Sequence, residues 1–253
     1  MRNKSEKPVL MDFSGIYPEQ RFYEKGGADW VEARGLPGTN CYCDEIAAEE
    51  LRKKIRNFSA KGIHFLDSGN YHYMSRIWLE KVTQPFRLLV FDNHTDMQPP
   101  AFGGLLSCGG WVAAALEELP LLQQVILCGP DQEAFSRVEE ELKKKVSFLS
   151  RECMEDGMGF IRKIPSDLPL YISVDKDVLC SGDARTTWSQ GDLRLEELLE
   201  MLQELLKRFH REGQQILGMD ICGETDPEET EGNDKNEFAN QRLLEVWESA
   251  EME

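Results

Sequence analysis

Residues 87–96 read RLLVFDNHTD: a short, mostly apolar run passes directly into a polar cluster that holds Asp92, His94 and Asp96. Runs of this kind lack a strict alternation of apolar and polar residues, which is typical of strands buried on both faces of a parallel sheet. Similar runs predict further strands at 9–13, 62–66, 124–128, 170–174 and 216–221. Together with 87–91, they predict a parallel sheet at the centre of the fold.

The segments between these runs are amphipathic and predict helices that cover both faces of the sheet. Residues 44–58 begin with Asp44, which can cap a helix, and carry apolar residues three or four positions apart. Residues 193–210 keep a stripe of leucines, and Gly213 follows near their end. This alternation predicts an α/β fold with three layers, α/β/α, around a mostly parallel central sheet.

We expect the whole chain, residues 1–253, to form one domain, because α/β layers reach about 250 residues as a single unit. Hydrophobic residues make up 41% of the chain, which is enough for a sizeable core. Residues 224–237 read ETDPEETEGNDKNE, and half of them are acidic. We interpret this stretch as a solvated acidic loop before a last helix at roughly 236–248.

The charge balance argues against several kinds of partner. The chain carries 29 Lys and Arg against 46 Asp and Glu, a net charge of −17, which opposes binding to nucleic acid and to anionic membranes. The start of the chain lacks the apolar core of a signal peptide, and no apolar run approaches the roughly 18 residues of a membrane span. We therefore expect a cytoplasmic protein.

The cysteines point to the same compartment. The chain has seven, an odd number, and none of them forms a CxxC pair. This pattern argues against a disulfide scaffold and against a structural zinc site, and it fits a reducing cytoplasm. Cys41 and Cys43 are the only close pair, and we interpret them as ordinary loop sequence.

Ligand-type side chains follow three of the predicted strands. They are His72 after 62–66, Asp92, His94 and Asp96 after 87–91, and Asp175 and Asp177 after 170–174. Ligands of open α/β sheets bind beyond the carboxyl ends of the strands. Residues i, i+2 and i+4 of an extended backbone project to one side, so each group can aim at one point. We therefore expect these side chains to meet in one pocket.

The side-chain set predicts a site for two manganese ions. Crowded carboxylates repel one another unless something neutralises them, and two divalent cations balance the charge of four aspartates. Carboxylates with two imidazoles suit Mn²⁺ better than zinc, which prefers Cys and His in tetrahedral sites. A two-metal site can lower the pKa of a water enough to supply hydroxide near neutral pH. A DxHxD segment alone would also fit a capped turn with a hydrogen-bonded histidine, so the prediction rests on the three groups together.

These segments resemble the ureohydrolase family of arginases and agmatinases. The matching stretches are Gly69-Asn-Tyr-His72, Phe91-Asp-Asn-His-Thr-Asp96 and Ser173-Val-Asp-Lys-Asp177, in the family's order along most of the chain. The resemblance implies an arginase-like fold with two Mn²⁺ per chain. It also implies a hydrolase that attacks a C–N bond of a guanidino or amidine-type substrate, with homo-oligomers as in relatives.

The resemblance further implies a distribution of ligands. One ion would be held by His72, Asp92, Asp96 and Asp175, and the other by His94, Asp92, Asp175 and Asp177. Metal-activated hydroxide would be the nucleophile, and Asp96 would accept its proton.

The family's substrate loop corresponds to residues 181–192. Here the resemblance implies that Asp183 contacts a substrate amino group, although an ordinary turn explains this residue equally well. Thr187 and Trp188 are expected to shape the substrate pocket. The sequence leaves open whether the guanidino group belongs to a small molecule or to a peptide-borne arginine.

Three positions depart from the family pattern. Cys108 stands where the family places a proton-shuttling histidine, and a thiol with an ordinary pKa of about 8.5 replaces imidazole poorly near pH 7. Glu224 comes one place later than the family's guanidinium-binding carboxylate, with Gly223 in the expected position, so it reaches a substrate only if the loop bulges. Lys176 should point away from the ions and pair with an acidic neighbour. Cys108 and Glu224 nevertheless join Asp96 as catalytic candidates.

Two other functions remain open. A metal-dependent deacylase on a related fold would use one zinc ion, which would leave His72, Asp96 and Asp177 without a role. A non-catalytic protein with the arginase fold would bind a partner instead, which the altered position of Cys108 and the acidic stretch 224–237 favour.

Overall fold

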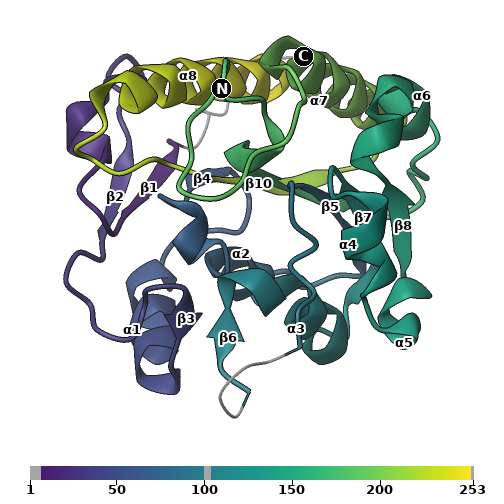
Figure 1. Cartoon of the computed structure of the whole chain (residues 1–253), viewed down its shortest axis with the longest axis horizontal. Coiled ribbons are helices and arrows are strands. Elements are labelled where there is room, and N and C mark those ends of the chain that lie inside the picture. The colour runs from purple at the N-terminus through teal and green to yellow at the C-terminus, as the bar shows by residue number, and fades with distance from the viewer. Residues whose placement is uncertain (1–6, 100–103, 252–253) are drawn as a thin grey trace.

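An eight-stranded sheet forms the centre of the computed structural model, which describes residues 7–99 and 104–251 (Figure 1). In spatial order the strands are β2 (Asp29–Glu32), β1 (Val9–Asp12), β4 (Ile63–Phe65), β10 (Ile216–Cys222), β9 (Leu170–Asp175), β5 (Phe86–Phe91), β7 (Leu122–Cys128) and β8 (Val146–Leu149). Every neighbouring pair in this sheet is parallel. The carboxyl ends of the strands therefore share one edge.

Helices cover both faces of the sheet, as Figure 1 shows, and the three-layer α/β/α fold is confirmed. One face carries α6 (Gly157–Ile161), α7 (Leu195–Arg211) and α8 (Thr230–Glu251). The other carries α1 (Glu45–Ile55), α2 (Met74–Leu79) and α3 (Trp111–Glu118), with the short helices α4 (Gln132–Ser136) and α5 (Glu140–Lys143) beside β8. A hydrophobic core lies between the sheet and each helical layer.

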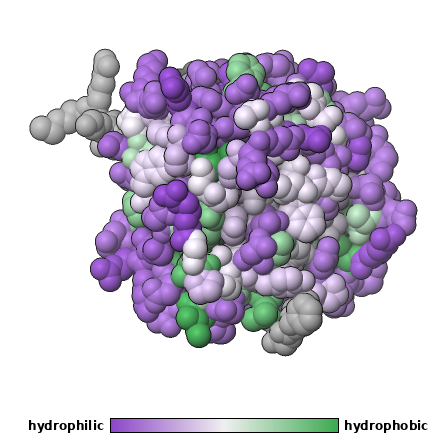
Figure 2. All heavy atoms as spheres, turned by 60° about the vertical axis from the view of Figure 1, so that its left-hand side comes forward, coloured by the Kyte–Doolittle hydropathy of each residue, from purple (hydrophilic) through white to green (hydrophobic). Residues whose placement is uncertain are grey.

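Short elements connect the layers. Five 3₁₀ helices are described: η1 (Tyr17–Glu19), η2 (Gly69–Tyr71), η3 (Cys108–Gly110), η4 (Arg151–Asp156) and η5 (Lys176–Val178). A separate antiparallel pair joins β3 (Tyr42–Cys43) to β6 (Leu106–Ser107). No helix within residues 7–99 and 104–251 is long and apolar enough to cross a membrane. The face seen in Figure 2 is mostly hydrophilic, with hydrophobic residues in small separate groups.

The six predicted strands are confirmed to within two residues at each end, but the sequence did not predict β2 and β8. Both lie at the edges of the sheet. An edge strand is covered less completely than a central one, so it does not need a continuous apolar run. In β2 only Val31 is buried, and the sequence therefore resembles a loop.

Two predicted helices are confirmed, and one boundary is wrong. Asp44 caps α1 by accepting a hydrogen bond from the Ala47 amide at 2.8 Å. The leucine stripe of 193–210 packs against the sheet as α7. The last helix, however, begins at Thr230, so only the first part of the stretch 224–237 is a loop. An acidic first turn is favourable at a helix N-terminus, which is why the negative charge there does not indicate a loop.

Candidate metal centre

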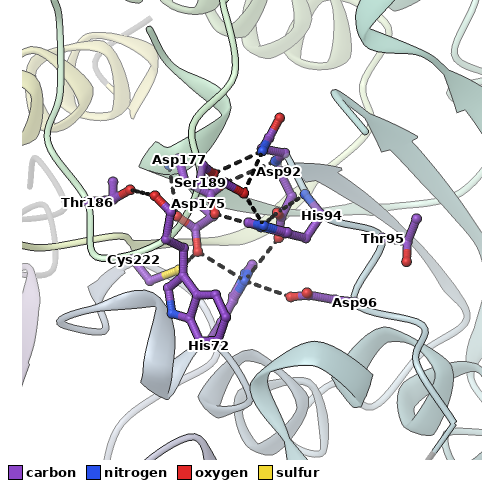
Figure 3. A network of polar contacts seen from close by, with 12 residues as sticks. His72, Asp92, His94, Thr95, Asp96, Asp175, Asp177, Thr186, Ser189 and Cys222 are labelled. Atoms are coloured by element: carbon purple, nitrogen blue, oxygen red, sulfur yellow. Dashed lines mark hydrogen bonds and ion pairs between the residues drawn. The ribbon is translucent and has the colours of Figure 1, made fainter. Parts of the chain in front are cut away.

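Side chains from the carboxyl ends of β5 and β9 converge with His72, which follows η2 (Figure 3). The backbone turns sharply at each place instead of continuing as a strand. Asp96 adopts a left-handed conformation with φ of 49°, and Asp177 lies in η5, where its amide donates to Asp175 Oδ1 at 2.9 Å. The predicted alternation along an extended backbone is therefore not what brings the groups together. Tight turns at a common sheet edge do so.

His72 is held so that one ring nitrogen faces the carboxylates. Its Nε2 lies 2.9 Å from the Ser173 hydroxyl. Its Nδ1 lies 3.2 Å from Asp92 Oδ2, 3.1 Å from Asp96 Oδ2 and 3.5 Å from Asp175 Oδ2. Among the described residues, neither His72 Nδ1 nor Asp92 Oδ2 has a partner in hydrogen-bond geometry. If Nε2 donates to Ser173, the Nδ1 lone pair points at three carboxylates, an arrangement that a cation between them would stabilise.

A second histidine completes an adjoining group. His94 Nδ1 lies 2.8 Å from Asp177 Oδ2 and 3.5 Å from Asp92 Oδ1, and its Nε2 lies 2.9 Å from the Ser189 hydroxyl. The His94 amide also donates to Asp92 Oδ1 at 2.6 Å. Because Asp92 also faces His72, its carboxylate lies between the two histidines, as a bridging ligand would.

The geometry fits metal ions at two adjoining positions. Three groups of side chains have ligand atoms within 4.8 Å of one another: His72 with Asp92 and Asp96; Asp92 with His94 and Asp177; and His72 with Asp175 and Cys222. All six predicted ligands belong to at least one of these groups. The donors are mainly carboxylate oxygens with two imidazoles, which suits Mn²⁺.

Cys222 is a member of this cluster that the sequence did not predict. It ends β10 directly beside Asp175 in the sheet register, and its thiol donates to Asp175 Oδ2 at 3.1 Å. The signal was present, because Cys222 follows the apolar run 216–221 at the same sheet edge. Glu224 in the same segment is a more typical metal ligand than Cys222, so the sequence pattern points to Glu224 first.

Burial and like charges shift the pKa values of the cluster. Burial, and then the charge of Asp92, raise the pKa of Asp96 to about 7, and the same two causes raise the pKa of Asp175. Burial and the neighbouring carboxylates also raise the pKa of Asp177. Burial by itself lowers the pKa of His94, but hydrogen bonds to Asp177 and Asp92 outweigh it and raise the value to about 12. The metal-free cluster therefore holds protons near neutral pH.

Cation binding must displace these protons, so we expect Mn²⁺ affinity to fall as the pH is lowered from about 8 to about 6. Each proton released corresponds to a change of roughly tenfold in affinity per pH unit. Isothermal titration calorimetry in two buffers of different ionisation enthalpy measures the number of protons released. An affinity that stays constant across this range would contradict the expectation.

A cavity of about 240 Å³ opens beside the cluster. It is lined by Cys41, Tyr42, Gly69, Asp92, His94, Asp96, Gln98, Ser107, Cys108, Gly109, Asp175, Asp177 and Trp188. Four of these side chains are carboxylic acids, and no Lys or Arg is among the described residues that line the cavity. Without bound metal ions, the cavity therefore favours a cationic or neutral group over an anionic one.

Trp188 forms part of the cavity wall and lies beside His94, with ring centroids 6.0 Å apart. Its indole Nε1 donates to Asn70 Oδ1 at 2.8 Å. A Cβ at Gly69 would lie 2.9 Å from Trp188 Cδ1, so the glycine permits the close approach of the indole. Cys108, the catalytic candidate in place of the family's histidine, also lines the cavity.

Glu224 lies elsewhere, in a buried polar network. Lys176 donates a short hydrogen bond to Glu224 Oε1 and another to Asn240 Oδ1 at 2.9 Å. Asn240 and Gln20 each donate to Glu224 as well, at 2.7 and 3.0 Å. The prediction that Lys176 pairs with an acidic neighbour is confirmed. Glu224 does not line the cavity, because Lys176 and these amides hold its carboxylate.

Two predicted substrate contacts also lie outside the cavity lining. Asp183 accepts hydrogen bonds from Arg194 Nε at 2.7 Å and from the Leu195 amide at 2.9 Å. It therefore holds the start of α7. Thr187 is exposed and does not line the cavity. Of the predicted substrate-binding residues, only Trp188 lines it.

Comparison with known proteins finds matches over most of the chain. Residues 44–246 match the model of the arginase family. An uncharacterized protein of Thermotoga maritima is 33% identical over 240 residues, which cover 93% of this chain and 87% of the relative. The crystal structure of formimidoylglutamase from Bacillus subtilis aligns with a TM-score of 0.73 at 15% identity, covering 100% of this chain and 88% of that one. The crystal structure of a variant of Trypanosoma cruzi formiminoglutamase with Mn²⁺ aligns with a TM-score of 0.67 at 13% identity, covering 97% and 94%.

Proposed function

The chain belongs to the arginase family and is a hydrolase acting on C–N bonds other than peptide bonds; we propose that it uses two Mn²⁺ ions and cleaves a guanidino or amidine-type substrate. The observation that carries this proposal is the orientation of His72. Its Nδ1 faces three carboxylates within 3.5 Å, which two cations would neutralise. The structure of the T. cruzi formiminoglutamase variant holds Mn²⁺, and the donor set of this chain suits the same ion.

We assign the ligands as two overlapping sets. One ion would be held by His72, Asp92, Asp96 and Asp175, and the other by His94, Asp92, Asp175 and Asp177. Such a pair of ions would supply an activated water near neutral pH and polarise the carbon under attack. Ser173 and Ser189 contact the outer nitrogens of the two histidines at 2.9 Å, and so keep the inner nitrogens directed at the site.

Asp96 is our candidate for holding a proton during the reaction. Trp111 Nε1 donates to its Oδ2 at 2.7 Å, and His72 Nδ1 approaches the same oxygen. Because both contacts occupy Oδ2, we assign the proton to the other carboxylate oxygen, Oδ1. Cys108 lies on the cavity wall in place of a histidine, and we propose that it contacts the substrate or a water and does not act as a base.

The cavity supports a cationic substrate. The described lining holds no Lys or Arg, and the chain as a whole carries a net charge of −17, which suits a protonated guanidine or amidine. The four carboxylic acids of the lining are the proposed metal ligands, so bound Mn²⁺ would neutralise them. Because Glu224 and Asp183 have other partners, we assign them no substrate contacts. We propose that Trp188 and Cys108 contact the part of the substrate that extends from its cationic group. We further propose that the protein works in the cytoplasm and as a homo-oligomer.

Metal content and product release test this function together. Protein loaded with Mn²⁺ and then gel-filtered should retain about two ions per chain by elemental analysis. It should release urea, ammonia or formamide from at least one member of a panel that includes arginine, agmatine, simple amidines, N-formimidoyl amino acids and an arginine peptide. Two bound Mn²⁺ without product from the whole panel would contradict the proposal. One Zn²⁺ per chain would favour a deacylase.

A further inference from the structure

Cys41 and Cys108 lie opposite one another on the cavity wall, although they are far apart in the sequence. The short strands β3 and β6 pair antiparallel, with Tyr42 opposite Ser107. Continuing this register by one residue places Cys41 opposite Cys108. The Cys108 amide donates to the Cys41 carbonyl at 2.9 Å, which joins the two residues immediately beyond the paired strands.

The two thiols also interact with each other. Burial raises the pKa of both thiols, and the hydrogen bond between the two side chains lowers the pKa of Cys41 and raises that of Cys108. Cys41 is therefore the thiol that this contact favours as the attacking thiolate. Cys41 has a left-handed φ of 59° and Cys108 begins η3, so the two residues lie just beyond the paired strands and share a single backbone hydrogen bond. Disulfides span Cα distances of about 4.4–6.8 Å. The backbones therefore approach closely at this point, and the two side chains contact each other.

We propose that Cys41 and Cys108 form a modification site, at which a low-molecular-weight disulfide converts the two thiols into a cross-strand disulfide. The thiolate of one cysteine attacks a sulfur of the reagent and releases one thiol. The thiolate of the other then attacks the mixed disulfide and releases the second. Two protein thiols lose two electrons and two protons, and one reagent disulfide becomes two thiols.

The consequence is local to the cavity. In the reduced form two polarisable S–H groups face the cavity, and in the oxidised form one S–S bridge replaces them. The bond would also tie the segment before α1 to η3, whose next residues hold Asp96 through the Trp111 indole. The site does not depend on the proposed hydrolase activity, because its formation requires only the two opposed thiols.

The other cysteines provide internal controls. Cys43 lies two residues from Cys41 but is buried, and Cys128 and Cys222 are buried as well. Cys153 is exposed and Cys180 is half-buried, so a small disulfide should attach to Cys153, and also to Cys180 where it reaches that thiol, without forming a protein crosslink. Reaction at Cys153 therefore shows that the reagent is active.

The test is treatment of the folded, full-length, Mn²⁺-loaded protein with oxidised glutathione, followed by alkylation in denaturant and non-reducing peptide mapping. We expect a crosslinked pair of peptides containing Cys41 and Cys108, with neither residue carrying glutathione, and full reversal by dithiothreitol. The intact mass should fall by about 2 Da for the bridge, apart from glutathione on Cys153 or Cys180. The mapping of the wild-type chain needs no variant and so does not depend on how a variant folds.

Two variants locate the bond. Cys43→Ser should keep the crosslink, since it removes the neighbouring thiol in the same tryptic peptide. Cys41→Ser should lose it, and circular dichroism would verify its fold. A bond between Cys41 and Cys43, glutathione on both Cys41 and Cys108, or two free thiols while Cys153 reacts would each overturn the proposal.

Discussion

Asp92→Asn will lose both metal ions and reduce the rate of the proposed hydrolysis by about 10³-fold or more. Asp92 belongs to two of the three ligand groups and faces both histidines. An amide of the same shape removes the negative charge that lies between the two proposed ions. Metal-ion catalysis contributes several kcal/mol, and each 1.36 kcal/mol corresponds to about tenfold in rate. Elemental analysis after gel filtration and a product-release assay measure the two effects.

Asp167→Asn is the matched control. Asp167 precedes the amino end of β9, on the side of the sheet away from the metal centre. It is largely exposed there and pairs with Arg87 at 2.7 Å. The same substitution there should leave metal content and rate unchanged, because exposed ion pairs contribute little. Full metal content in Asp92→Asn would refute the bridging assignment, whereas full metal without activity in the unaltered chain would refute only the proposed reaction.

Lys176→Met will lower the free energy of unfolding by about 3–5 kcal/mol, because it leaves the Glu224 carboxylate buried without its cation. Both side chains are almost fully buried. Gln20 and Asn240 donate to the same carboxylate but carry no charge. Urea denaturation of the metal-free protein, monitored by circular dichroism, measures the loss.

The double variant Lys176→Met/Glu224→Gln tests the cause. The loss in the free energy of unfolding of the double variant should be smaller than the sum of the losses of the two single variants by about 1–3 kcal/mol. In the double variant neither partner leaves a buried charge uncompensated. Lys53→Met is the control, because Lys53 pairs with Glu49 and Glu50 on the exposed surface of α1. We expect it to change stability by less than about 0.5 kcal/mol. Equal costs at Lys176 and Lys53 would show that the buried pair does not stabilise the fold.

The sequence predicts the central strands and the ligand cluster for one shared physical reason. Strands buried on both faces must be apolar throughout, so the polar residue that ends such a run is conspicuous. Asp92 and Asp175 end two adjacent strands, β5 and β9, and parallel strands bring such ends to one edge. His94 follows Asp92 by two residues and is expected beside it for the same reason, whereas His72 reaches the site only through the turn of η2 after β4.

The features that the sequence did not reveal depend on partners distant in the chain. Glu224 does not line the cavity because Lys176, Gln20 and Asn240 hold its carboxylate. Gly223 before it turns with a φ of 91°, and a Cβ there would lie 2.5 Å from Asp175 Oδ1. The spacing of acidic residues does not show that turn. Similarly, Cys41 meets Cys108 only through the β3–β6 pairing, and two-residue strands leave little pattern in a sequence.

The charge of the cavity wall affects how fast ligands arrive, and not only which ones bind. The chain carries a net charge of −17, and the carboxylic acids of the metal-free recess add to the field that guides Mn²⁺ toward it. Bound ions would neutralise those acids, so a cationic substrate is guided by the negative charge of the rest of the chain. Such guidance raises association rates by about 10–10³-fold and weakens steeply as ionic strength rises. If the substrate carries the proposed guanidinium, its conversion into neutral urea removes this attraction from that fragment, so the field that speeds capture does not slow the departure of urea.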